Sequence, residues 1–194
     1  MHYLKLIQNL EKYSKITDSD KKSIKFSFNP LKVRQKEILI SENEQCNKLF
    51  FVNKGLLRAY YTDSKGNEIT RRIAWESGFL TSIDSFRKKG LENNETIECI
   101  ENAELLVISK KEFEILISSS VNLRRAYQIL LEKYLAINMR RFQQLTSLSP
   151  AERLHYFDKN FPKLKNHISD TILATFLGIS RKTLERVRKN NIGH

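Results

Sequence analysis

The sequence has few of the residues that build covalent frameworks or metal sites. Its 194 residues include only two cysteines, Cys46 and Cys99, which lie far apart and form no CxxC pair. A disulfide framework, an iron–sulfur cluster and a zinc knuckle are therefore poorly supported. None of the four histidines lies between residues 26 and 108, where the sequence is β-type, which argues against a metal-dependent β-roll enzyme. We expect no metal and no bound cofactor.

Long apolar runs and catalytic motifs are missing too. No run of 18 apolar residues occurs, and the first residues, MHYLKLIQNLEKYSK, are amphipathic and charged, without the apolar core of a signal peptide. We therefore expect a cytoplasmic protein with no membrane partner. No GxSxG, Walker A, GxGxxG or HExxH motif is present. The sequence contains no catalytic constellation, so we expect a protein that is not an enzyme.

Positive charge is concentrated in the C-terminal part. The formal net charge is +12: residues 1–119 carry 20 Lys and Arg against 17 Asp and Glu, a net of +3, whereas residues 120–194 carry 14 against 5, a net of +9. Such a distribution attracts nucleic acid, although basic surfaces also serve solubility. Apolar residues make up 40% of the chain, which indicates a globular protein.

Short strands fill the region from about residue 26 to residue 108. The segments EILIS, KLFFVN, GLLRAYYT, EITRRIAW, ETIECIE and AELLVIS are rich in β-branched and aromatic residues and are separated by turn signals such as DSKGN. Strands at this spacing predict an antiparallel barrel or roll. Helical sequence with Leu4, Ile7 and Leu10 precedes them, and in TDSDKKSI we expect an Asp or Ser to cap a helix.

Helical sequence follows the strands. Ser109 and Glu112 form a capping box that opens a short helix, and residues 121–145 then contain no Gly or Pro. Within them apolar residues recur at spacings of 4, 3, 4 and 3: Leu123, Tyr127, Leu130, Tyr134 and Ile137. This heptad seam predicts a long dimerisation helix. A second strip, Leu131, Leu135 and Phe142, lies on a neighbouring face. One strip could pack on the β-domain and the other on a second copy of the same helix; the alternative is that both belong to the core of their own chain.

The last part of the chain contains a pair of short helices. Ser149 and Glu152 mark a helix start, with Pro150 at the first helical position. In SDTILATFLGISRKTLERVRK, Ser169 can cap one helix, Gly178 permits a tight turn and Ser180 can cap a second helix. This pattern predicts a helix-turn-helix, with an ordinary helical hairpin as the alternative. Its second helix turns Leu184 and Val187 inward and presents a basic outer face.

With these segments in order, the chain resembles the cAMP receptor protein and fumarate/nitrate regulator (Crp/Fnr) superfamily over nearly all its length. The resemblance implies an α+β fold: an antiparallel, cyclic-nucleotide-binding-like β-roll (a double-stranded β-helix) at 1–120, a long dimerisation helix at 121–146 and a small winged helix-turn-helix domain at 147–194. The wing is nearly absent, since the sequence stops at His194. GLLRAYYTDSKGNEITRRIAWESGFLTSIDSF is similar to the sensor domain, and GISRKTLERVRK to the recognition helix.

The resemblance implies roles for residues of that helix. Arg181, Lys182 and Arg186 would read base edges in the major groove, whereas Ser180 and Lys189 would hold phosphates. Many members of the superfamily carry Glu where this chain has Lys182, which leaves the base preference at that contact open.

The roll departs from members that bind cyclic nucleotides. Those members hold the phosphate with a Gly-Glu pair and, further on, with Arg, Ser or Thr, and Ala. Here the pair aligns with Thr81-Ser82 and the triplet falls near Asn93-Asn94-Glu95, so the ribose-binding acid and the phosphate-binding Arg are missing. We expect an unknown effector, not cAMP. A different pocket could be lined by Arg58, Trp75, Ser82 and Ser85, for which ordinary roll packing is the alternative.

The sequence thus predicts a homodimeric, sequence-specific transcription regulator whose partner is double-stranded DNA, with an inverted repeat as its site and RNA polymerase as a further candidate partner. The alternative from another class is a small-molecule sensor or interaction module that regulates a partner protein without binding DNA. That alternative explains the roll and the seam but not the helix-turn-helix pattern that includes Gly178, Leu184 and Val187.

Overall fold

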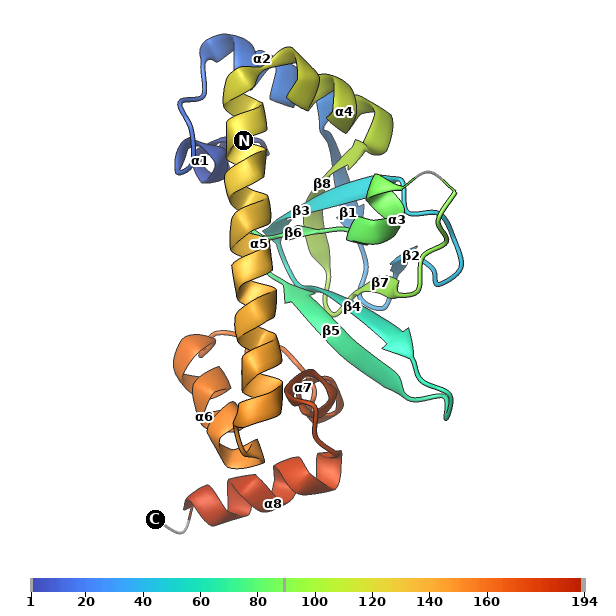
Figure 1. The fold of residues 1–194 in the computed structure, drawn as a ribbon, viewed down its shortest axis with the longest axis vertical. Helices are drawn as coiled ribbons and strands as arrows, with labels where there is room; N and C mark the ends of the chain where they lie inside the picture. The colour runs from blue at the N-terminus through green and yellow to red at the C-terminus, as the bar shows by residue number, and fades with distance from the viewer. Residues whose placement is uncertain (1, 89, 193–194) are drawn as a thin grey trace.

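The protein is built around a β-roll of two four-stranded sheets, in a computed structural model that describes residues 2–88 and 90–192 (Figure 1). One sheet has the order β1-β8-β3-β6, made of Asn29–Val33, Ala103–Ser109, Lys48–Lys54 and Phe79–Leu80. The other has the order β2-β7-β4-β5, made of Ile38–Ile40, Thr96–Cys99, Leu57–Thr62 and Glu68–Ala74. Every pairing is antiparallel. The predicted antiparallel roll within an α+β fold is therefore confirmed.

The roll is held together by an apolar core between its sheets. The central strands β3 and β8 consist mostly of apolar residues. Both supply side chains that are almost completely buried: Phe50, Phe51, Leu105, Leu106 and Ile108. Both cysteines are buried in this core as free thiols. Each fully buried Leu, Ile or Phe contributes about 1.5–3 kcal/mol of transfer free energy, which explains why the predicted strands could be recognised by their apolar content.

Three short helices precede or follow the sheets, and one of their two predicted start signals is found as expected. They are α1 (Leu4–Glu11), α2 (Asp18–Ser27) and α4 (Lys110–Ser119). The capping box of Ser109 and Glu112 is present at the start of α4. At α2 the cap is Thr17, not an Asp or Ser: its hydroxyl accepts the Asp20 amide, and the Asp20 carboxylate accepts the Thr17 amide in return. The expected capping residue was therefore wrong by one position in the chain.

Some elements gave no sequence signal. Strand β1 begins with Asn29 and Pro30 and is exposed over most of its length, so it lacks the β-branched, alternating pattern of its neighbours. Strand β6 is two residues long, and helix α3 (Ile83–Arg87) is five. Elements this short are fixed by their neighbours rather than by local propensity.

The long helix α5 (Val121–Ser147) is the spine of the molecule and lies along the roll (Figure 1). Leu123 is buried in the core of the roll, and Tyr127 and Leu130 pack against the same core. The Tyr134 hydroxyl lies 3.4 Å from the Arg72 guanidinium of β5. Four of the five residues of the heptad seam therefore face the roll of their own chain. Packing on the roll thus accounts for most of this seam, because heptad spacing does not distinguish a partner helix from a sheet. The dimer contact stays a prediction.

The exposed apolar side chains of α5 lie on other faces. Leu135, Met139 and Phe142 are 62%, 62% and 67% exposed. At 100° per residue they lie within about 60° of each other and close to Leu131, in the second strip that the sequence shows. We call Leu131, Leu135, Met139 and Phe142 the α5 apolar strip. Ile137 is 63% exposed but lies on the opposite side of the helix.

Three helices follow α5 at the end of the spine: α6 (Pro150–Asn160), α7 (Asp170–Leu177) and α8 (Arg181–Ile192) (Figure 1). The capping box of Ser149 and Glu152 opens α6, and Ser169 caps α7. Gly178 ends α7 in the left-handed conformation, with φ of 66°, as the tight turn requires. No strand occurs between β8 and the end of α8 in the described residues. The winged form of the domain stays a prediction. None of the described helices is both long and apolar enough to cross a bilayer.

Candidate nucleic-acid interface and effector pocket

Helix α8 is amphipathic in the sense that the sequence predicts. Leu184 is completely buried and Val187 is 8% exposed, in one cluster with Leu154, Phe157 and Leu173 of the neighbouring helices. The Ser180 hydroxyl caps the helix by accepting the Thr183 amide at 3.1 Å. The hydrophobic face thus fixes the rotation of α8 about its axis, and the opposite face is left to solvent.

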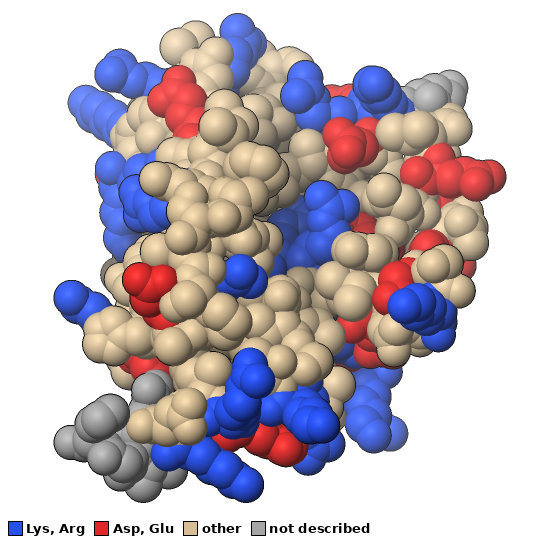
Figure 2. All heavy atoms as spheres, turned by 60° about the horizontal axis from the view of Figure 1, so that its bottom comes forward, with Lys and Arg blue, Asp and Glu red and all other residues tan. Residues whose placement is uncertain are grey.

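The outward face of α8 is basic. Arg181, Lys182, Arg186 and Lys189 are all exposed, and Figure 2 shows Lys and Arg side chains gathered over this end of the molecule. Arg181 forms an ion pair at 3.2 Å with Glu185, one turn later in the helix. Because both side chains are exposed, the ion pair holds the Arg181 side chain only weakly. Lys182, Arg186 and Lys189 form no ion pair with the described residues. The four predicted basic residues are therefore brought to one surface.

Arg188 has a different role from the other basic residues of α8. Its guanidinium donates to the Asp170 carboxylate in the first turn of α7 at 2.7 Å. The contact ties the two helices together and directs this side chain away from the exposed face. The turn between the helices is fixed as well, because the Arg153 guanidinium of α6 donates to the Leu177 carbonyl at 2.9 Å.

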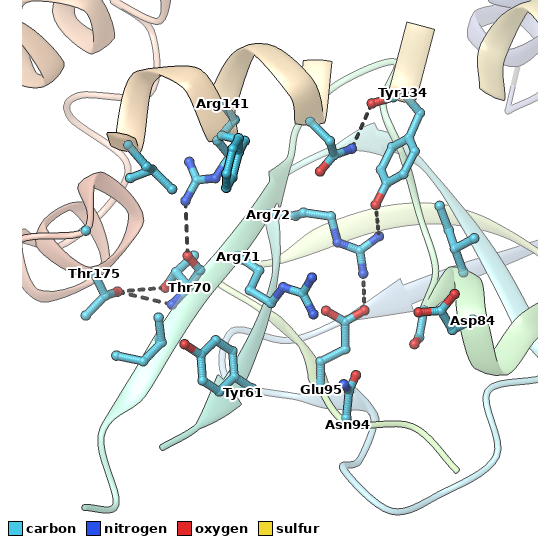
Figure 3. Close-up of a pocket in the computed structure, with 17 residues that line it drawn as sticks. Tyr61, Thr70, Arg71, Arg72, Asp84, Asn94, Glu95, Tyr134, Arg141 and Thr175 are labelled. Atoms are coloured by element: carbon cyan, nitrogen blue, oxygen red, sulfur yellow. Dashed lines mark hydrogen bonds and ion pairs between the residues drawn. The ribbon is translucent and has the colours of Figure 1, made fainter. Parts of the chain in front are cut away.

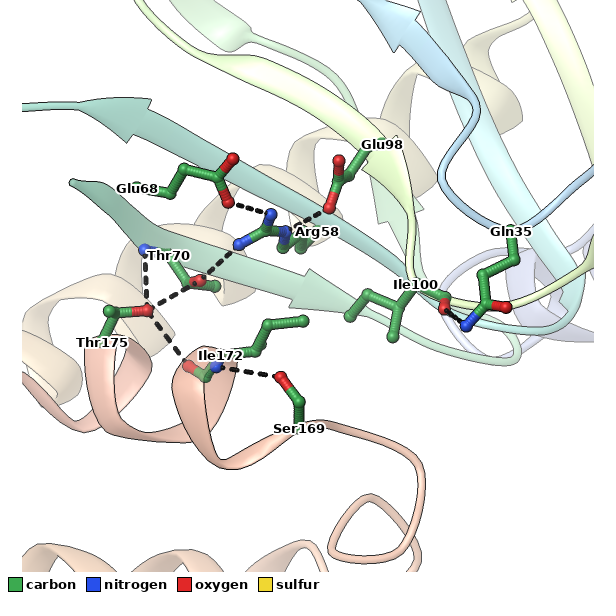
Figure 4. Close-up of polar contacts among 9 residues, drawn as sticks. All are labelled: Gln35, Arg58, Glu68, Thr70, Glu98, Ile100, Ser169, Ile172 and Thr175. Carbon is green, nitrogen blue, oxygen red and sulfur yellow. Dashed lines mark hydrogen bonds and ion pairs between the residues drawn. The ribbon is translucent and has the colours of Figure 1, made fainter. Parts of the chain in front are cut away.

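The unit formed by α6, α7 and α8 lies directly on the roll. Leu56 and Ile100 of the roll belong to the hydrophobic cluster of this unit. Thr175 of α7 accepts the Thr70 amide of β5 at 3.3 Å, and the two hydroxyl oxygens lie 3.0 Å apart (Figure 4). Trp75 packs edge-on against Phe161, with the ring centroids 5.4 Å apart. The position of α8 is thus coupled to the hairpin of β4 and β5.

A buried arginine supports the roll side of this contact. Arg58 of β4 is 6% exposed and donates to the Glu98 carboxylate at 2.6 Å and to the Glu68 carboxylate (Figure 4). Its third contact is the Thr70 hydroxyl at 3.5 Å, and its guanidinium lies over the Tyr60 ring. Arg58 therefore holds three strands of one sheet together beneath the residue that contacts α7.

A pocket of about 460 Å³ lies between the roll, α5 and α7 (Figure 3). Strand β5 supplies one wall, α3 and the segment before β7 supply another, and α5 and α7 line the rest of a pocket that is partly open to solvent. Because the pocket contacts both the roll and α7, a molecule bound there would touch both parts. Its charged lining residues are Arg71, Arg72, Asp84, Glu95 and Arg141.

These charges differ in how well they are paired. Arg72 donates to Glu95, to the Thr81 carbonyl at 2.8 Å and to the Tyr134 hydroxyl. Glu95 is 3% exposed, and its other carboxylate oxygen is buried without a hydrogen-bond partner in the described part of the chain. A free carboxylate at Glu95 would repel a cyclic phosphate. The ion pair with Arg72 offsets much of that charge, so the departure from the nucleotide-binding pattern depends mainly on the missing Arg.

The two remaining arginines have no acidic partner among the described residues. Arg141 of α5 donates to the Phe176 carbonyl at 2.7 Å and to the Thr70 carbonyl at 3.5 Å, and its guanidinium stacks on the Phe176 ring. Burial, together with the positive charge of Arg71, lowers the pKa of Arg141 to about 10. Arg141 remains cationic at neutral pH, but both its burial and Arg71 make that charge unfavourable.

Of the four residues predicted to line an effector pocket, only Ser82 does so. Arg58 is occupied by Glu68 and Glu98, and Trp75 packs on Phe161. Ser85 is buried, where it accepts the Cys46 amide at 2.8 Å and donates to the Leu91 carbonyl. These three side chains contact other parts of their own chain and do not line this pocket.

The pocket residues that sequence reasoning missed come from distant segments. Arg71 and Arg72 are adjacent in β5, Glu95 precedes β7, and Arg141 is about seventy residues further along the chain in α5. One signal was available: in EITRRIA, alternation turns consecutive residues to opposite faces of the strand, so one of the two arginines had to face inward. No group of three His, Cys, Asp or Glu residues suited to a metal ion occurs within residues 2–88 and 90–192.

Comparisons with known proteins agree with this architecture. The family model of the cyclic nucleotide-binding domain matches residues 30–120. The structure is similar to that of FixK2 from Bradyrhizobium japonicum, with a TM-score of 0.73, 15% identity and coverage of 84% of this chain and 83% of that one. The chain has the fold of the Crp/Fnr regulators. No curated protein sequence matches it.

Two further solved structures show how far the Crp/Fnr fold extends along the chain. A protein described as a transcriptional regulator of the Crp/Fnr family from Eubacterium rectale gives a TM-score of 0.72 at 20% identity, with 91% of this chain and 84% of that one covered. The c-di-GMP-responsive global regulator CLP of Xanthomonas campestris gives 0.73 at 16% identity, with 91% and 92% covered. Coverage of this extent includes the roll, α5 and C-terminal helices, so the Crp/Fnr fold applies to most of the chain.

Proposed function

We propose that the chain is a homodimeric, sequence-specific DNA-binding transcription regulator. The observation that carries the proposal is the exposed basic face of α8, held in a fixed orientation by the buried Leu184 and Val187. A helix placed in this way can enter the major groove, where arginine donates two parallel hydrogen bonds to guanine. The Crp/Fnr fold supports this use of the helix, since regulators such as CLP share it.

Different residues of α8 would have different tasks. Arg181, Lys182 and Arg186 would contact base edges, with Glu185 giving up its ion pair to Arg181 as that arginine reaches the DNA. Lys189 would contact a phosphate, as would the amides beside Ser180 at the start of the helix. Sequence preference would therefore depend on the arginines, whereas Lys189 would add affinity for any duplex.

The α5 apolar strip is the proposed dimer contact. Leu135, Met139 and Phe142 are exposed in the single chain although they follow helical spacing on a straight helix of 27 residues. A second copy of α5 would cover them by twofold symmetry. The two copies of α8 would then read an inverted repeat, with half-sites about 34 Å apart or a multiple of that spacing.

The roll would hold an effector other than a cyclic nucleotide. Its phosphate-binding Arg is missing, and Glu95 is already paired with Arg72. RNA polymerase is the further partner that such a regulator would meet at a promoter. We expect neither cAMP nor cGMP to bind at micromolar concentrations.

The test separates base reading from phosphate binding. Duplexes bound by the full chain are first selected from a random pool, and then Arg186→Ala and Lys189→Ala are titrated against the selected site and a scrambled site. Arg186→Ala should lose about 1–3 kcal/mol on the selected site only, whereas Lys189→Ala should weaken both alike. Lys25→Ala, an exposed lysine of α2 at the far end of the molecule from α8 (Figure 1), should change neither. Equal losses on both duplexes for Arg186→Ala would exclude its reading of a base.

A further inference from the structure

The pocket between β5, α5 and α7 contains more positive charge than its own acids neutralise. Facing it are Arg71, Arg72 and Arg141 against Asp84 and Glu95. Arg72 and Glu95 pair with each other, and Asp84 forms no ion pair within the described residues and is exposed. Arg71 of β5 and Arg141 of α5 are therefore two cations that line the pocket from different elements. Asp84 is the one carboxylate of the lining that could serve both of them, since Glu95 is paired with Arg72.

The surroundings of Arg141 in particular disfavour its positive charge. Its guanidinium contacts only neutral groups, namely two carbonyl oxygens and the Phe176 ring. Figure 3 shows the Arg71 side chain pointing into the same pocket from β5. Two like charges in a partly desolvated site repel each other unless an anion lies between them.

The pocket also contains a buried hydrogen-bond acceptor that lacks a donor. One carboxylate oxygen of Glu95 is buried without a hydrogen-bond donor in the described part of the chain. An unsatisfied buried acceptor is costly, and most such groups are paired in folded proteins. A donor on a bound molecule would satisfy it without displacing Arg72 from the other oxygen.

From these two features we infer that the pocket binds a small organic acid, a carboxylate or phosphate ester, which also carries a hydroxyl or amino group. The acid group would lie between Arg71 and Arg141, and the hydroxyl or amino group would donate to Glu95. The volume of about 460 Å³ is within the range of small-molecule sites. The binding site stands on its own observations. The pocket also touches Thr175 and Gly178, next to α8, so binding there would affect the helix proposed to contact DNA. This regulatory effect rests on the proposed function.

The experiment is a calorimetric titration of the full chain with matched pairs of acids. Malate and glycerol 3-phosphate carry both groups, whereas succinate and inorganic phosphate lack the alcohol hydroxyl on carbon, and sodium chloride controls for ionic strength. We expect malate or glycerol 3-phosphate to bind, and to bind more tightly than its partner without the hydroxyl. Whichever of the two binds identifies the acid as carboxylate or phosphate. If neither binds at millimolar concentrations, or if cAMP binds more tightly than both, the inference is wrong.

Two variants locate the binding. Arg71→Gln removes an exposed guanidinium of β5 and should weaken binding roughly tenfold to a hundredfold, the usual effect of one charge-assisted hydrogen bond. Arg140→Gln changes an exposed arginine next to Arg141 that does not line the pocket, and should leave binding unchanged. Equal binding by the wild type and Arg71→Gln would overturn the assignment. The titration contains no DNA, so its result does not depend on DNA binding. If the acid binds but the chain shows no affinity for DNA, the binding site stands and only the proposed function is refuted.

Discussion

Replacing Leu135 by lysine should break the dimer, and replacing Ile137 by lysine should not. The two side chains are almost equally exposed in the single chain, at 62% and 63%. They lie on the same helix, two residues apart, and therefore on opposite sides of it. Leu135 belongs to the α5 apolar strip, whereas Ile137 lies outside it, so the second variant is a matched control.

The size of the effect follows from the exposed area of Leu135. Complete burial of a leucine is worth about 1.5–3 kcal/mol, so burying the exposed 62% should contribute about 1–2 kcal/mol per chain. A symmetric dimer contains two copies, and the loss is then about 2–4 kcal/mol before any cost of burying the lysines. The dimer dissociation constant should rise roughly thirtyfold to several hundredfold.

Sedimentation of the wild type and both variants at micromolar concentration measures this directly, with far-ultraviolet circular dichroism to show that each variant is folded. A monomer for Leu135→Lys and a dimer for Ile137→Lys are expected. The opposite result would mean that the copies meet through the side of α5 that bears Ile137. A monomeric wild type would end the proposal of a dimer.

Two predictions concern stability, both measured by urea denaturation at fixed protein concentration. Arg58→Ala should destabilise the fold by about 3–5 kcal/mol, because it leaves Glu98 without its cation and the Glu98 side chain is only 15% exposed. Lys21→Ala breaks the more exposed ion pair with Glu11 and should cost less than about 1 kcal/mol. Similar losses for the two variants would contradict a special role for the Arg58 cluster. Gly178→Ala should cost more than Gly66→Ala: both glycines have positive φ, but an added carbon at 178 would lie 2.9 Å from the Leu145 side chain, whereas Gly66 has open space. Equal costs would show that Leu145 moves aside freely.

The sequence was most informative where one local interaction decides the structure. The capping boxes at Ser109 and Ser149 and the left-handed turn at Gly178 depend on a few neighbouring residues, and each is found where it was predicted. The six strands recognised from their β-branched and aromatic residues all lie in the two sheets, because such residues pack on a pleated surface whichever strand lies beside them. Of the strands in the described residues, only β1 and β6 were missed.

Features that depend on contacts between distant segments of the chain were harder to predict from the sequence. The heptad seam of α5 has the same spacing whether it meets a second helix or a sheet, and here Leu123 and Tyr127 pack on the roll. Arg58 resembled a pocket residue in the sequence because nothing local reveals that Glu98, forty residues later, pairs with it. The pocket charges likewise come from β5, the segment before β7 and α5, and only the folded chain brings them together.

The central claim, that α8 reads DNA, is tested most directly by the salt dependence of binding to a selected inverted repeat. The wild-type chain should bind that site far more tightly than a scrambled duplex, and its affinity should fall steeply as salt rises, since each phosphate contact releases counterions. Lys189→Ala should reduce the slope of log affinity against log salt by about 1 for each phosphate that Lys189 neutralises in the wild type. A wild-type chain that binds both duplexes equally, or with no salt dependence, would contradict the account and favour a module that acts on a protein partner.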